Sequence, residues 1–80
     1  YINLFGGGKM KAYKNSSGEI IAVSKSSIDG KHYNIYRRCP NGEFKVVGQH
    51  TYESREEAER DMDRFAAYSD CGYRLINYHG

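Results

Sequence analysis

Three glycines and a lysine, Gly6-Gly7-Gly8-Lys9, are the first residues of this chain with the potential for chemistry. A glycine-rich loop that ends in lysine can hold phosphates with its backbone N–H groups. That loop needs a further glycine where this chain has Asn3, and a serine or threonine where it has Met10. The pattern therefore predicts a linker. We expect residues 1–9 to form a flexible or added N-terminal segment ahead of a single domain that spans residues 10–80.

Five side chains of the types that bind metals or act as nucleophiles are scattered along the chain: His32, His50, His79, Cys39 and Cys71. Their spacing matches no zinc module. A Cys–His nucleophile would also need a depressed thiol pKa and a third group to orient it. We therefore predict no metal, no cofactor and no catalytic residue, and hence a protein that is not an enzyme. Two distant cysteines without a CxxC pair are typical of a reducing compartment. We therefore expect free thiols and a cytoplasmic location, with one long-range disulfide as the alternative.

Six carboxylates crowd residues 53–63 and alternate with arginines: Glu53, Glu56, Glu57, Glu59, Asp61 and Asp63, with Arg55, Arg60 and Arg64 among them. Paired carboxylates can perform acid–base catalysis. On a helix that is interleaved with arginine they more often form a solvated face whose charges neutralise one another. We favour this second interpretation for the acidic run.

The charge of the chain is divided unevenly between its two parts. Residues 1–52 hold eight Lys and Arg against three acids, a net charge of +5, whereas residues 53–80 hold four Arg against seven acids, a net charge of −3. Apolar residues make up 39% of the chain and charged residues 28%, which is typical of a folded domain rather than a disordered one. No stretch is long and apolar enough to predict a signal peptide or a membrane span.

The pattern along the chain predicts an α+β domain with the order β-β-β-β-α-β. Period-two alternation and β-branched residues predict strands at about 9–14, 19–24, 31–39 and 43–51, and a short last strand at 73–78. Between them, residues from Ser54 to Cys71-Gly72 have the period of a helix. We therefore expect an antiparallel sheet of three to five strands, with one amphipathic helix packed on one face.

The helix has a recognisable start and a single apolar stripe. Ser54-Arg55-Glu56-Glu57 is a capping box, in which the Ser54 hydroxyl accepts from the Glu57 N–H and the Glu57 carboxylate accepts from the Ser54 N–H. Ala58, Met62, Phe65 and Ala66 follow at helical spacing and form the stripe. Gly72 is suited to the residue just after a helix end.

Turn residues set the pairing of the central strands. Pro40-Asn41-Gly42 predicts a three-residue hairpin loop with a bulge, which pairs Tyr36 with Val46 and Ile35 with Val47. Asp29-Gly30 predicts another hairpin, and Gly48 indicates a bulge or a close packing contact.

The stretch Lys31–Lys45 is basic and rich in tyrosine, which makes it the strongest candidate for a binding surface. Neighbouring residues of a strand point to opposite faces of the sheet. One set is therefore Tyr33, Ile35 and Arg37, and the other is His32, Asn34, Tyr36 and Arg38. One helix covers one face, so either set leaves tyrosine and Lys or Arg on the exposed face. These residues suit phosphates and bases. The alternative is an ordinary soluble sheet whose charges discourage edge pairing.

The segment from Gly30-Lys31-His32-Tyr33-Asn34-Ile35-Tyr36 to Phe65 adds a resemblance to a known family. It combines the Pro40-Asn41-Gly42 hairpin, a strand that ends at Thr51-Tyr52 and a helix opened by Ser54-Arg55-Glu56-Glu57-Ala58. This order resembles the three-strand-plus-helix arm-type domain at the front of phage and transposon integrases, a family that reads DNA with its sheet face. The resemblance covers under half of the chain and implies that the sheet face reads DNA. The contacts that it implies are Tyr33, Asn34, Tyr36, Arg37, Arg38 and Lys45.

We therefore predict a small, non-enzymatic binding domain of a phage or mobile element that contacts nucleic acid through its basic sheet face. The alternative is a protein-interaction or inhibitor domain, which would use the acidic helix as a mimic of nucleic acid, an edge strand or the tyrosine face. Neither interpretation calls for a membrane. A homodimer formed through an edge strand is a further partner that the strand pattern allows.

Overall fold

The computed structural model describes residues 9–26 and 30–79, and it confirms the predicted α+β class and element order. The elements are β1 (Lys9–Lys14), β2 (Ile20–Lys25), β3 (Tyr33–Arg38), β4 (Phe44–Tyr52), α1 (Arg55–Tyr68) and β5 (Arg74–His79). The N-terminal segment was predicted to span residues 1–9. Its last residue, Lys9, is the first residue of β1, and residues 1–8 lie outside the described part of the chain.

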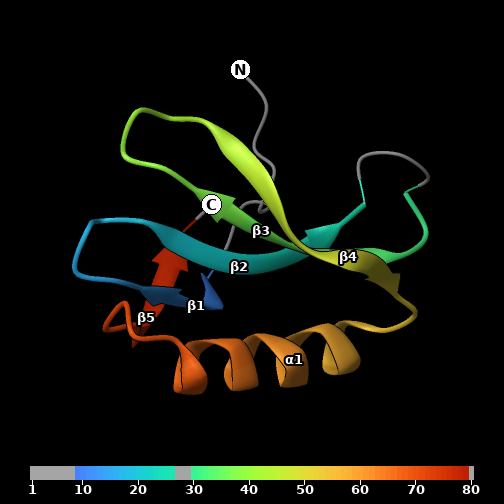
Figure 1. The fold of residues 1–80 in the computed structure, drawn as a ribbon. Coiled ribbons are helices and arrows are strands. Elements are labelled where there is room, and N and C mark those ends of the chain that lie inside the picture. Colours follow the sequence, from blue (N-terminus) through green and yellow to red (C-terminus); the bar gives the residue numbers. More distant parts are fainter. Residues whose placement is uncertain (1–8, 27–29, 80) are drawn as a thin grey trace.

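The five strands form one antiparallel sheet in the order β4-β3-β2-β1-β5. This order makes β4 and β5 the two edge strands, and it points them in the same direction. After β4 the chain must therefore return along the sheet before β5 can begin. A helix of 14 residues spans about 21 Å, which matches the roughly 20 Å of a six-residue strand. Figure 1 shows α1 on one side of the sheet, running from the end of β4 toward β1 and β5.

The predicted register of the central hairpin is confirmed. Tyr36 pairs with Val46 and Ile35 with Val47, around a loop in which Gly42 has a φ of +92°. The Cys39 carbonyl accepts from the Gly42 N–H at 2.9 Å, and the Cys39 N–H donates to the Glu43 carbonyl at 2.8 Å. The hairpin rises away from the helix at this loop (Figure 1).

The predicted bulge near Gly48 is also present. Gly48 has a φ of +88°, and the β3–β4 register shifts between Tyr33 and Ile35. Of the Asp29-Gly30 hairpin, Gly30 has a φ of +68° and its N–H donates to the Ser26 carbonyl at 2.9 Å, whereas Asp29 lies outside the described residues.

The helix begins as predicted and ends earlier than predicted. The Ser54 hydroxyl accepts from the Glu57 N–H at 3.1 Å, but the Glu57 carboxylate accepts from the N–H of Glu53 at 3.3 Å rather than from that of Ser54. The last helical residue is Tyr68, and Ser69 is extended. The Ser69 hydroxyl accepts from the Cys71 N–H at 3.2 Å, so a separate turn takes up the residues up to Gly72.

The core lies between α1 and the β2–β3 centre of the sheet. Ile21, Val23 and Ile35 pack there against the apolar stripe of the helix, of which Ala58, Met62 and Ala66 are buried. Phe65, the fourth residue of the predicted stripe, is instead 37% exposed at the border of this contact, where its ring lies 5.8 Å from the ring of Tyr73.

Candidate nucleic-acid interface

The face of the sheet turned away from α1, here called the distal face, is defined by the strand register. Residues paired across antiparallel strands share a face, and Ile21, Val23 and Ile35 face the helix. The distal face therefore carries the alternate residues, which are, among those with described side chains, Ala12, Lys14, Ile20, Ala22, Ser24, Asn34, Tyr36, Arg38, Phe44, Val46, Arg74 and Ile76. No carboxylate is among them.

Three exposed cations lie in one cross-strand row of the distal face. The register places Phe44, Arg38, Ile20, Lys14 and Arg74 side by side on β4, β3, β2, β1 and β5. The side chains of Lys14, Arg38 and Arg74 are exposed. From Arg38 to Arg74 the row crosses three strand spacings of about 4.8 Å, or roughly 14 Å. We call these three residues the cation row.

The neighbouring row of the distal face is apolar and is buried at its centre, whereas Val46 at the β4 edge is 51% exposed. It consists of Val46, Tyr36, Ala22, Ala12 and Ile76. Tyr36 forms a buried cluster with the two alanines, and Ile20 and Ile76 pack against that cluster. Among the described side chains of the distal face, the charged ones that reach solvent are therefore those of the cation row.

The six residues predicted to contact nucleic acid are divided between the two faces. Tyr33, Arg37 and Lys45 lie on the helix side, because they are paired in register with helix-facing residues. Asn34, Tyr36 and Arg38 lie on the distal face, where Asn34 and Tyr36 are only 5% and 4% exposed. Of the six residues, Arg38 alone is both distal and exposed.

Each of the three residues on the helix side has a different environment. The Arg55 guanidinium lies over the Tyr33 ring, 5.2 Å from its centroid. The Lys45 ammonium lies 4.0 Å from the Glu43 carboxylate, in an exposed pair. The Nε atom of Arg37 is buried and has no hydrogen-bond partner in the described structure.

Sequence reasoning missed Lys14 and Arg74, which complete the cation row. Both residues stand at strand ends, Lys14 as the last residue of β1 and Arg74 as the first of β5. They become neighbours because β5 pairs with β1. β5 does not pair with β4, although only α1 separates these two strands along the chain. Basic residues at two strand ends were the available signal, but the strand order that joins them is a long-range property.

The acidic residues of the chain's last part gather on the opposite side, with the helix. Two of them bind the sheet. The Tyr52 hydroxyl donates to Asp61 at 2.7 Å, and the Tyr13 hydroxyl donates to Asp63 at 2.7 Å. The Lys11 ammonium also donates to Asp63, at 2.8 Å. The interpretation of the acidic run as a solvated, self-neutralising face is therefore incomplete for these two partly exposed carboxylates, which also fix α1 to β4 and β1.

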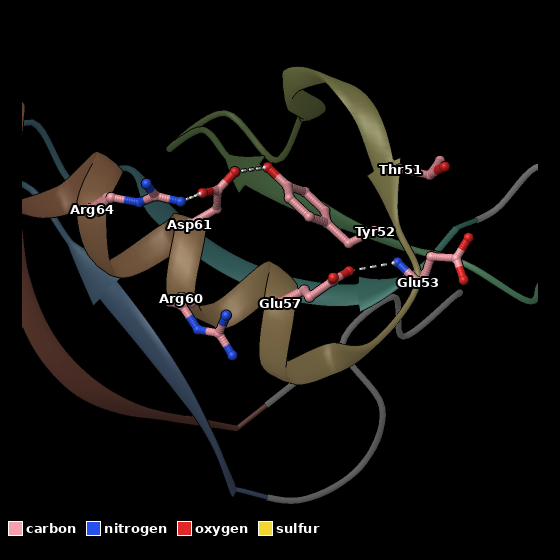
Figure 2. Close-up of a pocket in the computed structure, with 7 residues that line it drawn as sticks. All are labelled: Thr51, Tyr52, Glu53, Glu57, Arg60, Asp61 and Arg64. Atoms are coloured by element: carbon pink, nitrogen blue, oxygen red, sulfur yellow. Dashed lines mark hydrogen bonds and ion pairs between the residues drawn. The ribbon is translucent and has the colours of Figure 1, made fainter.

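A polar cavity of about 270 Å³ lies where α1 meets the end of β4, as Figure 2 shows. It is lined by Thr51, Tyr52, Glu53, Glu57, Arg60, Asp61 and Arg64. Arg64 is paired with Asp61, which also accepts from Tyr52 (Figure 2). Burial, the hydrogen bond to Asp61 and its negative charge raise the pKa of Tyr52 to about 12. Three carboxylates against two guanidinium groups leave this cavity without an excess of positive charge, so an anion is better matched by the distal face.

The hydrogen bonds of Asp63 to Lys11 and Tyr13 predict how much this carboxylate stabilises the packing of α1 on the sheet. Burial raises the pKa of Asp63, but the hydrogen bonds from Lys11 and Tyr13 and the charge of Lys11 outweigh it and hold the pKa below the usual value of 3.8. A lowered pKa means that Asp63 stabilises the fold above pH 3.8, and that this contribution is lost as the pH falls through the lower folded-state value. We expect Asp63→Asn to cost about 1 kcal/mol of unfolding free energy at neutral pH, since the site is half exposed.

Urea unfolding at neutral and acidic pH checks this expectation. The difference between Asp63→Asn and the unaltered chain should shrink toward zero in acid, where the carboxylate is protonated in both states. Asp70→Asn, at an exposed carboxylate beyond the helix, is the matched control and should change little at either pH. A cost of Asp63→Asn that is equal at both pH values would contradict the assignment.

Of the other predicted candidates for chemistry, the side chains of His50 and His79 lie outside the described part of the structure. Cys39 and Cys71 are both free thiols. The Cys39 Sγ lies 4.0 Å from a Glu19 carboxylate oxygen. In residues 9–26 and 30–79, no group of three or more His, Cys, Asp or Glu side chains is arranged to hold a metal ion. Within the same residues no helix has the length and apolar character needed to cross a membrane. Comparison of the chain with protein-family models, with curated proteins and with solved structures found no match.

Proposed function

We propose that this domain binds nucleic acid through the phosphate backbone, with the cation row Lys14, Arg38 and Arg74 as the main contact. The observation that carries the proposal is the separation of charge across the sheet. Three exposed cations share one row of the distal face, the described strand residues of that face include no acid, and the carboxylates of α1 lie on the other side.

Phosphate contact is favoured over the reading of bases. Base edges in a groove are read by side chains such as Asn, Gln and Arg that project from the protein. Among the described side chains of the distal face the one amide is Asn34, which is buried, and the row beside the cations is apolar. Cations that hold phosphates position a nucleic acid without selecting its sequence. We therefore expect binding that is weakly dependent on sequence.

The resemblance to arm-type integrase domains extends the proposal to DNA of a phage or mobile element, and so to a cytoplasmic location. The revised contact set differs from the one that this resemblance implies. It keeps Arg38, adds Lys14 and Arg74, and assigns no phosphate contact to Tyr33, Arg37 or Lys45, which lie on the helix side.

Salt-dependent binding of a labelled, mixed-sequence oligonucleotide, measured by fluorescence anisotropy, tests the proposal. Each neutralised phosphate releases counterions, so the logarithm of the affinity should fall linearly with the logarithm of the salt concentration. Lys14→Ala/Arg74→Ala removes two cations of the row. We expect about a tenfold loss of affinity at low salt, and a salt slope that is shallower by roughly 1.4 for a single strand.

The matched control is Lys25→Ala/Arg60→Ala, which removes the same charge from exposed positions on the helix side. It should keep most of the affinity and the salt slope. Equal losses in the two double variants would mean that overall charge, rather than the cation row, governs binding, and would overturn the site. Absence of salt-dependent binding would overturn the proposed function and leave the protein-interaction alternative.

A further inference from the structure

An aromatic side chain stands at one end of the cation row. Phe44, the first residue of β4, is 39% exposed, and it lies next to Arg38 in the cross-strand register. The Arg38 guanidinium lies 6.0 Å from the centroid of the Phe44 ring. Single exposed apolar residues are common on proteins. This one is distinguished by its place, because it continues a line of three cations toward an open edge of the sheet.

Phe44 lies on an edge strand of the sheet, and its side chain is partly exposed there. Among the described strands, β4 is the last one on this side of the sheet. A flat group that approaches from beyond the edge could therefore stack on the ring while its charged backbone follows the cations. Sequence-tolerant binding of single strands combines these two features, a basic track for the backbone and an aromatic side chain for a base.

A duplex fits this arrangement less well than a single strand. In a duplex the base faces are already stacked on one another, so an exposed phenylalanine finds no base face to contact. The apolar row of Val46, Tyr36, Ala22, Ala12 and Ile76 also offers no long polar side chain to a groove. The distal face thus provides backbone contacts and one stacking surface.

We infer that the distal face binds single-stranded nucleic acid, with its backbone lying across the strands along Arg74, Lys14 and Arg38 and with one base stacked on Phe44. This inference rests on the proposed function, and it names the class of nucleic acid and the residue that distinguishes it. Arg38 has two roles in this arrangement: it holds a phosphate, and it lies beside the ring on which the neighbouring base stacks.

Phe44→Leu separates stacking from charge, because leucine keeps the apolar character and removes the aromatic face. Base stacking on an aromatic residue contributes to single-strand affinity whatever the sequence, because every base has a flat face. We expect Phe44→Leu to weaken binding of a mixed-sequence single strand about five- to tenfold with an unchanged salt slope, and to leave binding of the same sequence as a duplex unchanged. The unaltered protein should prefer the single strand.

The matched control is Phe65→Leu, at a phenylalanine of nearly equal exposure (37%) on the helix side, which should leave single-strand binding unchanged. Thermal unfolding of each variant shows that the fold is retained. Equal affinity for single strand and duplex, or equal binding by Phe44→Leu and the unaltered protein, overturns this inference. The proposed function would still hold if added salt and Lys14→Ala/Arg74→Ala both weaken binding. If neither the single strand nor the duplex shows salt-dependent binding, both the inference and the proposed function are overturned.

Discussion

Met62→Ala should lower the free energy of unfolding by about 3 kcal/mol, within the range of roughly 2–5 kcal/mol typical of such truncations. Met62 is fully buried and is among the largest side chains with almost no exposed surface. Its neighbours on the buried stripe of α1 are the alanines Ala58 and Ala66. Met62 is therefore the long side chain by which the helix fills the space above Ile21 and Val23, and its removal leaves a cavity.

The size of this loss matters because the chain is short. A domain of 80 residues is expected to have a total stability of about 4–12 kcal/mol. Met62→Ala should thus remove a large part of it, seen as a lower midpoint in urea with a similar slope. Met62→Leu keeps the volume and should cost under about 1.5 kcal/mol. A small loss for both variants would show that the helix is held mainly by its polar contacts.

The central hairpin and the helix could be predicted from the sequence because their determinants are local. The turn at Pro40-Asn41-Gly42 fixes the pairing of the two strands that it joins, and one correct turn sets Tyr36 against Val46. Ser54 caps the helix through atoms three residues away. The helix end was predicted less well, because Gly72 adopts a positive φ in a turn that follows the helix rather than closing it.

The cation row could not be predicted because it depends on the order of the strands. Lys14 and Arg74 are 60 residues apart in the sequence, and they meet only because β5 pairs with β1. The face of the central hairpin that meets the helix was left open by its alternating pattern. Ile35 packs with Ile21 and Val23 of β2 in the core under α1. The strand residues that alternate with Ile35 therefore face away from the helix.

The two carboxylates that bind the sheet had a signal in the helical spacing. Asp61 and Asp63 flank Met62, so they lie at the two borders of the buried stripe, about 200° apart around the helix axis. Tyr52 on β4 meets one of them and Tyr13 on β1 meets the other. Border positions of an amphipathic helix are where polar side chains can reach back to the sheet. Because the prediction treated the acidic run as a single group, it did not separate these two border carboxylates from the other acids of the helix.

These two tyrosines should make the fold sensitive to alkaline pH. Burial, a hydrogen bond to an aspartate and the negative charge of that aspartate raise the pKa of both Tyr13 and Tyr52 from 10.0 to about 12. A tyrosine whose folded-state pKa is raised stabilises the fold fully below the unfolded-state value, and this contribution is lost as the pH rises through the folded-state value. The free energy of unfolding should therefore fall between pH 10 and about pH 12.

Tyr13→Phe/Tyr52→Phe keeps both rings and removes both hydroxyls, so the double variant should be less stable at neutral pH and should lose less stability between pH 10 and pH 12. Urea unfolding at several pH values measures both effects, and tyrosinate absorbance follows the titration directly. Tyr68→Phe is the control, since that side chain is 84% exposed and its loss should not alter the alkaline slope. The two hydroxyls would have no part in holding α1 to the sheet if the double variant and the unaltered protein lost stability in parallel over this range.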